Sequence, residues 1–426
     1  MKKRIAIVDG VRTPMTKAGT ALKDIEADAL AAAAVKGLLQ RTDMDVGSVD
    51  ELIFGNVATP VHAANISRVI ALKAGLPVDM PAFTVSRNCA SGMESITTAA
   101  SKILAGVGDV YIVGGVESMS NIPFLFSREM KDFFSSLYKA RNLPSRLKAL
   151  LSFRLRFIKP VIGVVQGLTD PISGMILGDT AELLAREFRI SREEQDRFAL
   201  KSHQRAVRAS KDGIFDQEIV PVPLGAEIQE KDVGPRDNQS LEALGKLSPY
   251  FDKVNGTVTV GNSSPLTDGA CALLVMEEER AREMGYSPLG YLKEYTYVSL
   301  DPARMGLGPV YATAALLKKS GASMKDFQII ELNEAFAAQV LACLEAFDSE
   351  KFAIESLNLP HSVGKIDQEI LNVNGGAIAL GHPVGMTGAR LVLHTLKELN
   401  RRHQQTGLAT LCVGGGQGAA FLLEST

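Results

Sequence analysis

The sequence predicts a layered α/β fold with a mixed β-sheet. Short β-branched runs alternate with alanine-rich helical patterns along the 426 residues, and this alternation occurs in two separate parts of the chain. Apolar residues make up 46% and charged residues 22%, a composition typical of globular proteins that excludes global disorder. The 46 basic and 48 acidic side chains nearly balance, so the chain as a whole has no electrostatic preference for nucleic acid.

The predicted elements follow one another as strand and helix in both parts. In the first part, runs rich in β-branched residues predict strands at residues 5–8, 51–54, 82–85 and 110–113. Apolar residues at helical spacing predict helices at residues 28–39, 64–73 and 92–104. The second part predicts strands at 289–297, 327–332 and 409–413, and helices at 310–318, 334–347 and 387–398.

Two segments of the chain resemble each other and indicate a duplication. Residues 268–275 (DGACALLV) and 417–424 (QGAAFLLE) both place Gly-Ala before an apolar run typical of a buried strand. Internal similarity of this kind predicts two similar halves, joined near residues 277–287.

The cysteines indicate a reducing compartment. Cys89, Cys271, Cys343 and Cys412 are too far apart in the sequence for a CxxC metal or redox pair. No signal peptide is expected at the start, where MKKR precedes only a short apolar run, and no stretch has the ~18 apolar residues of a membrane span. We therefore expect reduced thiols and a cytoplasmic location.

Residues 120–257 interrupt the alternation and include a basic, apolar segment. Residues 131–159 hold eight Lys or Arg side chains and a single acid. Four leucines share one helical face within this segment: Leu143, Leu147, Leu150 and Leu151. One interpretation is an element that docks on a partner or a membrane surface, and the other is a helix packed on its own domain with a solvated basic face.

Two residues at predicted turns could form a nucleophile and its base. Cys89 lies between a strand and a helix, and the positive end of the helix dipole favours the thiolate form that attacks carbonyl groups. His382 lies in a glycine-rich turn before another helix, where it could take a proton from a thiol. The alternatives are a small buried apolar residue for Cys89 and a structural role for His382.

Two further residues extend this set. A strand delivers Cys412 to a glycine run whose free N–H groups could bind an oxyanion, and its thiol could act as an acid or base. The alternative, favoured when this segment is taken alone, is a buried cysteine at the end of a strand followed by a turn. Asn333 follows a predicted strand, where its amide could orient a water or a carbonyl or could simply cap a helix. Together, a nucleophile, a base, a second thiol and glycine-backed amides point to acyl transfer through a thioester intermediate.

These segments carry a resemblance to the thiolase family over nearly the whole chain. The matching segments share their order and spacing with that family: 11–14 (VRTP), 88–92 (NCASG), 113–120 (VGGVESMS), 261–270 (GNSSPLTDGA), 333–337 (NEAFA), 375–390 and 412–418. The resemblance implies the thiolase fold, an α/β fold of duplicated halves forming α-β-α-β-α layers with an inserted loop domain. It places the N-terminal half at 1–284 (core 1–119 and 258–284, insertion 120–257) and the C-terminal half at 285–426.

The resemblance also implies catalytic roles for the residues already singled out. Cys89 would be the acylated nucleophile, and His382 the base that activates it. Cys412 would exchange a proton with the α-carbon of the acetyl unit, and Asn333 would hold a water in a first oxyanion hole beside His382. The backbone N–H groups of Cys89 and Gly414 would form the second oxyanion hole.

The implied activity is that of a 3-ketoacyl-CoA thiolase of fatty-acid β-oxidation, an acyltransferase. Ser264 and Phe336 would line the pantetheine tunnel, with coenzyme A as a substrate, no tightly bound cofactor and no metal. A homodimer or tetramer is implied. The insertion resembles that of thiolase β-subunits of the fatty-acid oxidation complex, which implies a hydratase/dehydrogenase partner subunit, and residues 131–159 could make a peripheral membrane contact.

Three other functions remain open from the sequence. An acetyl-CoA C-acetyltransferase is less favoured, because short-chain thiolases carry His-Met where this chain has Ile176-Leu177. A decarboxylating condensing enzyme would lack the second thiol, which Cys412 supplies. A non-catalytic thiolase-like lipid carrier or scaffold tends to lose the nucleophile or the base, and this chain has both.

Overall fold

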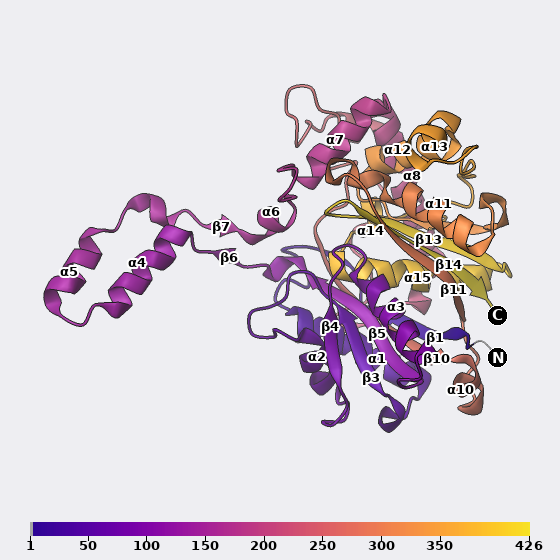
Figure 1. The fold of residues 1–426 in the computed structure, drawn as a ribbon, viewed down its shortest axis with the longest axis horizontal. Coiled ribbons are helices and arrows are strands. Elements are labelled where there is room, and N and C mark those ends of the chain that lie inside the picture. Colours follow the sequence, from indigo (N-terminus) through magenta and orange to yellow (C-terminus); the bar gives the residue numbers. More distant parts are fainter. Residues whose placement is uncertain (1–2) are drawn as a thin grey trace.

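The computed structural model describes residues 3–426 and is built on one ten-stranded mixed sheet (Figure 1). Met1 and Lys2, which open the segment where no signal peptide is expected, lie outside the described residues. The strand order is β12-β13-β14-β11-β1-β10-β5-β3-β4, and β2 pairs with β10. The strands of the first part are β1 (Ile5–Arg12), β2 (Thr16–Lys17), β3 (Glu51–Gly55), β4 (Ala82–Val85), β5 (Val110–Ser118) and β10 (Thr267–Glu277). Those of the second part are β11 (Gly290–Ser299), β12 (Ile329–Leu332), β13 (Thr406–Val413) and β14 (Gln417–Ser425).

Strand directions repeat on the two sides of the antiparallel β1–β11 pair. On one side β3 pairs parallel with β5, and β5 and β1 pair antiparallel with β10. On the other side β12 pairs parallel with β13, and β13 and β11 pair antiparallel with β14. The strands β10 and β14 therefore hold equivalent places, and they contain the two segments whose similarity predicted the duplication.

Helices form three layers around the two halves of the sheet. The outer face of the first half is covered by α1 (Ala27–Thr42) and α2 (Ile66–Ala74), and that of the second by α11 (Gly308–Ser320) and α12 (Ala337–Asp348). Between the halves lie α3 (Ser91–Leu104) and α15 (Val384–Arg401), which pack on each other and on both parts of the sheet (Figure 1). Buried apolar side chains fill all three interfaces, which gives the predicted α-β-α-β-α order.

The predicted strands and helices of both halves are all present, with shifts at their ends. The largest shift concerns β5, which ends at Ser118 rather than at residue 113. The helix α12 begins at Ala337 rather than at residue 334. The cause is tertiary, because Ser264 N–H donates to the Ala335 carbonyl at 2.9 Å and Phe336 forms a bridge with Ser263 in an extended conformation. Smaller helices of this part are α10 (Glu278–Glu283), α13 (Glu350–Leu357) and α14 (Ala377–Leu380).

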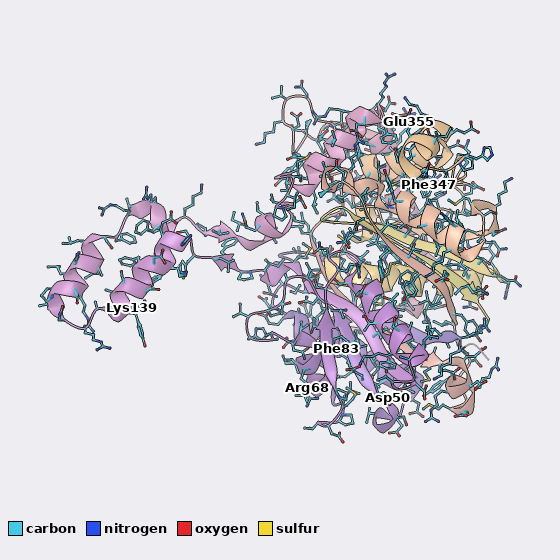
Figure 2. All side chains as sticks on the ribbon, in the orientation of Figure 1. Asp50, Arg68, Phe83, Lys139, Phe347 and Glu355 are labelled. Carbon is cyan, nitrogen blue, oxygen red and sulfur yellow. The ribbon has the colours of Figure 1, made fainter. Side chains whose placement is uncertain are left out.

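The inserted segment forms a projecting hairpin and a return to the body. The hairpin is a two-helix extension carried by a pair of short strands: β6 (Phe124–Leu125), α4 (Arg128–Lys139), α5 (Leu143–Leu151) and β7 (Val161–Ile162). It stands clear of the sheet, with Lys139 on its far part (Figures 1 and 2). The return consists of α6 (Gly163–Gly167), α7 (Leu177–Glu187), α8 (Arg192–Lys211), β8 (Val222–Leu224), β9 (Glu227–Gln229) and α9 (Leu241–Gly245).

The hairpin keeps its own small aromatic core and exposes its leucines. Phe133 packs against Phe134 and Phe153, with ring centroids 5.6 and 5.3 Å apart. Leu143 and Leu151, however, are 81% and 70% exposed. The interpretation that this leucine face packs on its own domain is therefore wrong.

No helix among residues 3–426 combines the length and apolar character needed to traverse a bilayer.

Candidate functional site

Cys89 lies in the turn between β4 and α3, at the base of the central helical layer. Its side chain is only 7% exposed, and the preceding Asn88 has a left-handed backbone with φ of 44°. Burial raises the pKa of the Cys89 thiol, although the N–H groups of Gly414 and of Cys89 itself face the sulfur and act in the opposite direction. The expectation of a thiolate held by the helix terminus is therefore corrected, because removal from water outweighs the local dipoles.

The turn between β13 and β14 brings the second cysteine and a backbone donor to the same place. Cys412 is 1% exposed and pairs with Gly418 across the two strands. Its pKa is raised well above the ordinary value, first by burial and then by the nearby Cys89 sulfur. Gly414, two residues further on, directs its N–H at the Cys89 sulfur. Residues from opposite ends of the sequence thus converge on one sulfur atom.

Close helix packing sets the position of the first cysteine relative to the turn that carries His382. A Cβ added to Gly92 would lie 2.6 Å from the backbone nitrogen of Ala389, and one added to Gly388 would lie 2.7 Å from that of Met93. The N-terminal turns of α3 and α15 therefore meet backbone to backbone, which only glycine allows. Because Cys89 and His382 each lie two residues before one of these helices, their turns share the same end of the layer.

His382 has a defined tautomer. The Thr387 hydroxyl donates to the Pro383 carbonyl at 2.9 Å, so its oxygen accepts the hydrogen of His382 Nδ1, which lies 2.6 Å away. The lone pair of the ring is therefore on Nε2, which faces the Asn333 side-chain nitrogen at 3.5 Å. Burial lowers the pKa of His382 to about 4, and the positive charge of Arg390 contributes in the same direction.

Asn333 lies at the end of β12 and is 1% exposed. Its backbone N–H donates to the Thr410 carbonyl of β13 at 3.0 Å, which fixes the residue beside the strand that carries Cys412. Its side-chain oxygen is buried and has no hydrogen-bond partner among residues 3–426. Since buried amide oxygens are normally paired, Asn333 has bonding capacity left for a ligand.

Ser264 and Phe336 lie together on the Cys412 side of the site. The Ser264 N–H bonds to the carbonyl of Ala335, the residue before Phe336. Phe336 packs in one apolar cluster with Cys412 and Met305, and its ring centroid lies 6.0 Å from that of Phe251. The two residues predicted for a pantetheine tunnel therefore form a half-buried wall that leads outward from the second thiol.

Sequence reasoning missed two residues that hold the site together. Thr387 orients His382, and the only signal was a hydroxyl one turn into the helix after the histidine. Glu117, at the end of β5, accepts hydrogen bonds from the N–H groups of Ala58 and Gly385, each at 3.0 Å. It thus ties the start of α15 to the first half, and burial raises its pKa to about 7.

The described residues contain no cluster that would hold a metal. Among residues 3–426, no three or more His, Cys, Asp or Glu side chains are placed to ligate one ion. All four cysteines are buried and free of disulfides. The chemistry that this arrangement offers is therefore that of two thiols, one neutral imidazole, one amide and oriented backbone N–H groups.

Comparison with known proteins identifies the same family along the whole chain. Residues 5–279 match the thiolase N-terminal domain and residues 286–425 the thiolase C-terminal domain. The mitochondrial trifunctional enzyme subunit beta of Bos taurus is 43% identical, over 99% of this chain and 88% of that protein. A 3-ketoacyl-CoA thiolase of Escherichia coli is 41% identical, over 99% of this chain and 97% of that protein.

Solved structures agree with these relatives. Human mitochondrial 3-ketoacyl-CoA thiolase, solved in complex with CoA, superposes with a TM-score of 0.86 at 35% identity and covers 100% of this chain and 98% of its own. The acetyl-CoA acetyltransferase of Bacillus anthracis gives a TM-score of 0.87 at 36% identity, covering 100% and 99%. From the two family matches, the identities over the full length and the shared fold, we conclude that the chain belongs to the thiolase family.

Proposed function

We propose that the chain is a 3-ketoacyl-CoA thiolase that acts in fatty-acid β-oxidation. It cleaves 3-oxoacyl-CoA reversibly with CoA, giving acetyl-CoA and an acyl-CoA shortened by two carbons. The observation that carries this proposal is that the turn of Cys89 lies against the turn that follows Cys412, joined by the 2.7 Å hydrogen bond from the Asn88 side chain to the Gly414 carbonyl. The effects on the pKa values of Cys89 and Cys412 agree with this proximity. Relatives named 3-ketoacyl-CoA thiolase support it over nearly the whole chain.

In the first step Cys89 attacks the keto carbon of the substrate. Its proton passes to Nε2 of His382, which is neutral and available because its pKa is low. The bond between carbons 2 and 3 then breaks, and the Cys412 thiol gives its proton to the departing acetyl-CoA carbanion. The Cys412 thiolate then takes the proton of a second CoA thiol, whose sulfur takes the acyl group from Cys89. The Cys89 sulfur recovers its proton from His382, and the synthetic direction reverses these steps.

Two sets of donors stabilise the negative charges that develop. The N–H groups of Cys89 and Gly414 serve the oxygen of the acyl group on Cys89, since both face its sulfur. Asn333 and His382 serve the thioester oxygen of the acetyl unit, with a water held by the Asn333 amide. Each oriented donor contributes about 3–4 kcal/mol to lowering the barrier, which makes the carbanion an accessible leaving group.

Coenzyme A is proposed to bind as a substrate along the wall formed by Ser264 and Phe336. Beyond this wall, Phe251 also borders an open surface hollow that includes Arg186 and Lys253. The hollow also holds Asp179 and Asp252, and Arg186 pairs with Asp252 at 3.7 Å. Arg186 and Lys253 are the side chains proposed to meet the phosphates of CoA. The human thiolase was solved in complex with CoA, which supports CoA as the substrate.

The main alternative is an acetyl-CoA C-acetyltransferase, because solved structures with that title superpose equally well. CoA-dependent cleavage of 3-oxoacyl-CoAs from C4 to C16 tests the choice. The proposal predicts turnover beyond C4, and turnover of acetoacetyl-CoA alone would contradict it. A decarboxylating condensing enzyme would instead turn over malonyl thioesters, and a lipid carrier or scaffold would turn over none of these.

The division of the chain and its assembly belong to the same proposal. The N-terminal half comprises 1–284, with its core at 1–119 and 258–284 and the inserted loop domain at 120–257, and the C-terminal half comprises 285–426. The assembly is a homodimer or tetramer. A hydratase/dehydrogenase subunit is a partner, since one relative is a subunit of a trifunctional enzyme. The cytoplasmic location expected from the reduced thiols stays a prediction.

The projecting hairpin is proposed to contact an anionic membrane surface at its periphery. Residues 131–159 carry eight basic side chains against one acid, and large apolar side chains on both helices face solvent, among them Tyr138 and Leu143 at 93% and 81% exposure. Basic charge beside exposed apolar surface suits acidic headgroups and the acyl boundary below them. Binding to a partner subunit is the competing outcome, and vesicle sedimentation distinguishes the two.

A further inference from the structure

Asn88 links the turn of the first cysteine to the turn of the second. Its side-chain nitrogen donates to the Gly414 carbonyl at 2.7 Å, across 326 residues of sequence. Gly414 therefore has two neighbours from the same turn, since its carbonyl meets Asn88 and its N–H meets the sulfur of Cys89. Asn88 itself has no role in the reaction assigned above.

The backbone around Asn88 fixes the direction of its side chain. Its φ of 44° lies in the left-handed region, which costs most residues about 1–2 kcal/mol but which Asn tolerates. The Asn88 carbonyl accepts from the Ser91 N–H at 3.0 Å and from the Ser91 hydroxyl at 2.7 Å. These hydrogen bonds from the first turn of α3 therefore stabilise the strained backbone of Asn88. The Asn88 amide reaches the glycine run from a fixed position.

The glycine run after Cys412 needs a contact that fixes its backbone orientation. Gly414, Gly415 and Gly416 are consecutive, and the last two have left-handed φ values of 88° and 75°. Glycine loses more backbone entropy on ordering than any other residue, so an unsupported run would sample several orientations. A Cβ placed on Gly414 or Gly415 would lie 3.8 or 3.9 Å from Asn88 Nδ2, so the Asn88 amide borders both glycines.

We propose that Asn88 is a positioning residue that aligns the Gly414 N–H with the Cys89 sulfur. This inference rests on the proposed thiolase function for its catalytic meaning. An oxyanion donor acts only if it is oriented before charge develops, and losing such a donor costs about 10²–10³ in kcat. Without the hydrogen bond from Asn88, the Gly414 N–H is still present but is less well oriented. The expected loss of kcat is therefore smaller than the loss caused by removing the donor.

The test uses Asn88→Gly, which keeps the left-handed backbone and removes only the amide. We expect kcat to fall about tenfold with KM for CoA changed less than twofold. Asn88→Asp, which cannot donate to a carbonyl, should lose at least as much. The matched control is Asn358→Gly, because Asn358 also has a left-handed φ, of 52°, but ends the remote helix α13.

A second readout is independent of turnover. The pH dependence of Cys89 alkylation by iodoacetamide should move to higher pH in Asn88→Gly and stay unchanged in Asn358→Gly, because a misaligned N–H stabilises the thiolate less. A wild-type alkylation profile and kcat in Asn88→Gly would overturn the inference. An enzyme without thiolase turnover that still shows the alkylation shift would overturn the proposed function and leave the positioning role intact.

Discussion

The Thr387 hydroxyl determines which nitrogen of His382 carries the proton. Its hydrogen is committed to the Pro383 carbonyl, so its oxygen, 2.6 Å from Nδ1, can only accept. Nε2 is left with its lone pair toward Asn333. A base that takes a proton from a thiol needs its lone pair on the nitrogen that faces the thiol. Thr387, in the first turn of the helix that follows His382, stabilises this tautomer.

Removing this hydroxyl should reduce catalysis without unfolding the protein. Thr387→Val keeps the shape of the side chain but frees the ring to adopt the other tautomer, and we expect kcat to fall ~10–100-fold. Thr387→Ser retains the hydroxyl and should keep most of the activity. Steady-state kinetics beside thermal unfolding measure both effects. Equal activity of the valine and serine variants would contradict this role.

The resting state should hold a neutral thiol and a neutral imidazole. The pKa of Cys89 is raised by burial, so little thiolate exists near pH 7, and alkylation by iodoacetamide should accelerate with pH to a midpoint above that of N-acetylcysteine. The Cys89→Ala variant identifies the labelled site. A midpoint below that of the free thiol would show a thiolate–imidazolium pair instead.

The acid side of the activity profile follows from the same burial. Because the pKa of His382 is lowered to about 4, the ring stays unprotonated as the pH falls from 7 to 5. The base is lost only when the pH approaches 4. We therefore expect no loss of kcat attributable to this histidine between pH 7 and 5, measured with stability checked at each pH. A decline in kcat with a midpoint near pH 6.5, under conditions where the protein stays folded, would contradict this assignment.

Two glycines of the β13–β14 hairpin should respond differently to a methyl group. A Cβ on Gly418 would lie 2.1 Å from the Gly308 carbonyl oxygen, a backbone atom that cannot move aside, whereas one on Gly414 would meet nothing closer than 3.8 Å. Gly418→Ala should lower the free energy of unfolding by about 1–3 kcal/mol or more, and Gly414→Ala should change it little. Urea unfolding of both variants tests this; similar losses would contradict the packing described.

The projecting hairpin should be removable. Residues 126–160 can be replaced by Asn-Gly between Leu125 and Val161, which already pair across β6 and β7. Turnover and the free energy of unfolding should stay close to wild type, since the hairpin has its own aromatic core. Sedimentation with acidic vesicles should be lost. If the wild-type protein sediments no more with acidic vesicles than with neutral ones, the membrane proposal is contradicted.

Local sequence was sufficient to predict the elements and the turns that carry Cys89, His382, Cys412 and Asn333. Strand-to-glycine and glycine-to-helix transitions are encoded within a few residues, so they can be identified without tertiary information. The similarity of 268–275 to 417–424 likewise predicted the equivalence of β10 and β14.

What the sequence did not predict depends on contacts between distant segments. The protonation state of Cys89 follows from burial in the folded protein, which outweighs the effect expected from the helix terminus. The start of α12 is set by the Ser264–Ala335 hydrogen bond. Each depends on geometry between elements that the order of residues alone does not specify.

Trapping the acyl-enzyme tests the central claim most directly. The protein is mixed with a 3-oxoacyl-CoA in the absence of free CoA, quenched in acid, digested and analysed by mass spectrometry. The account predicts an acyl group, shorter than the substrate by two carbons, on the peptide that contains Cys89, and its release when CoA is added. An acyl group on Cys412 instead, or turnover with no label on Cys89, would contradict it.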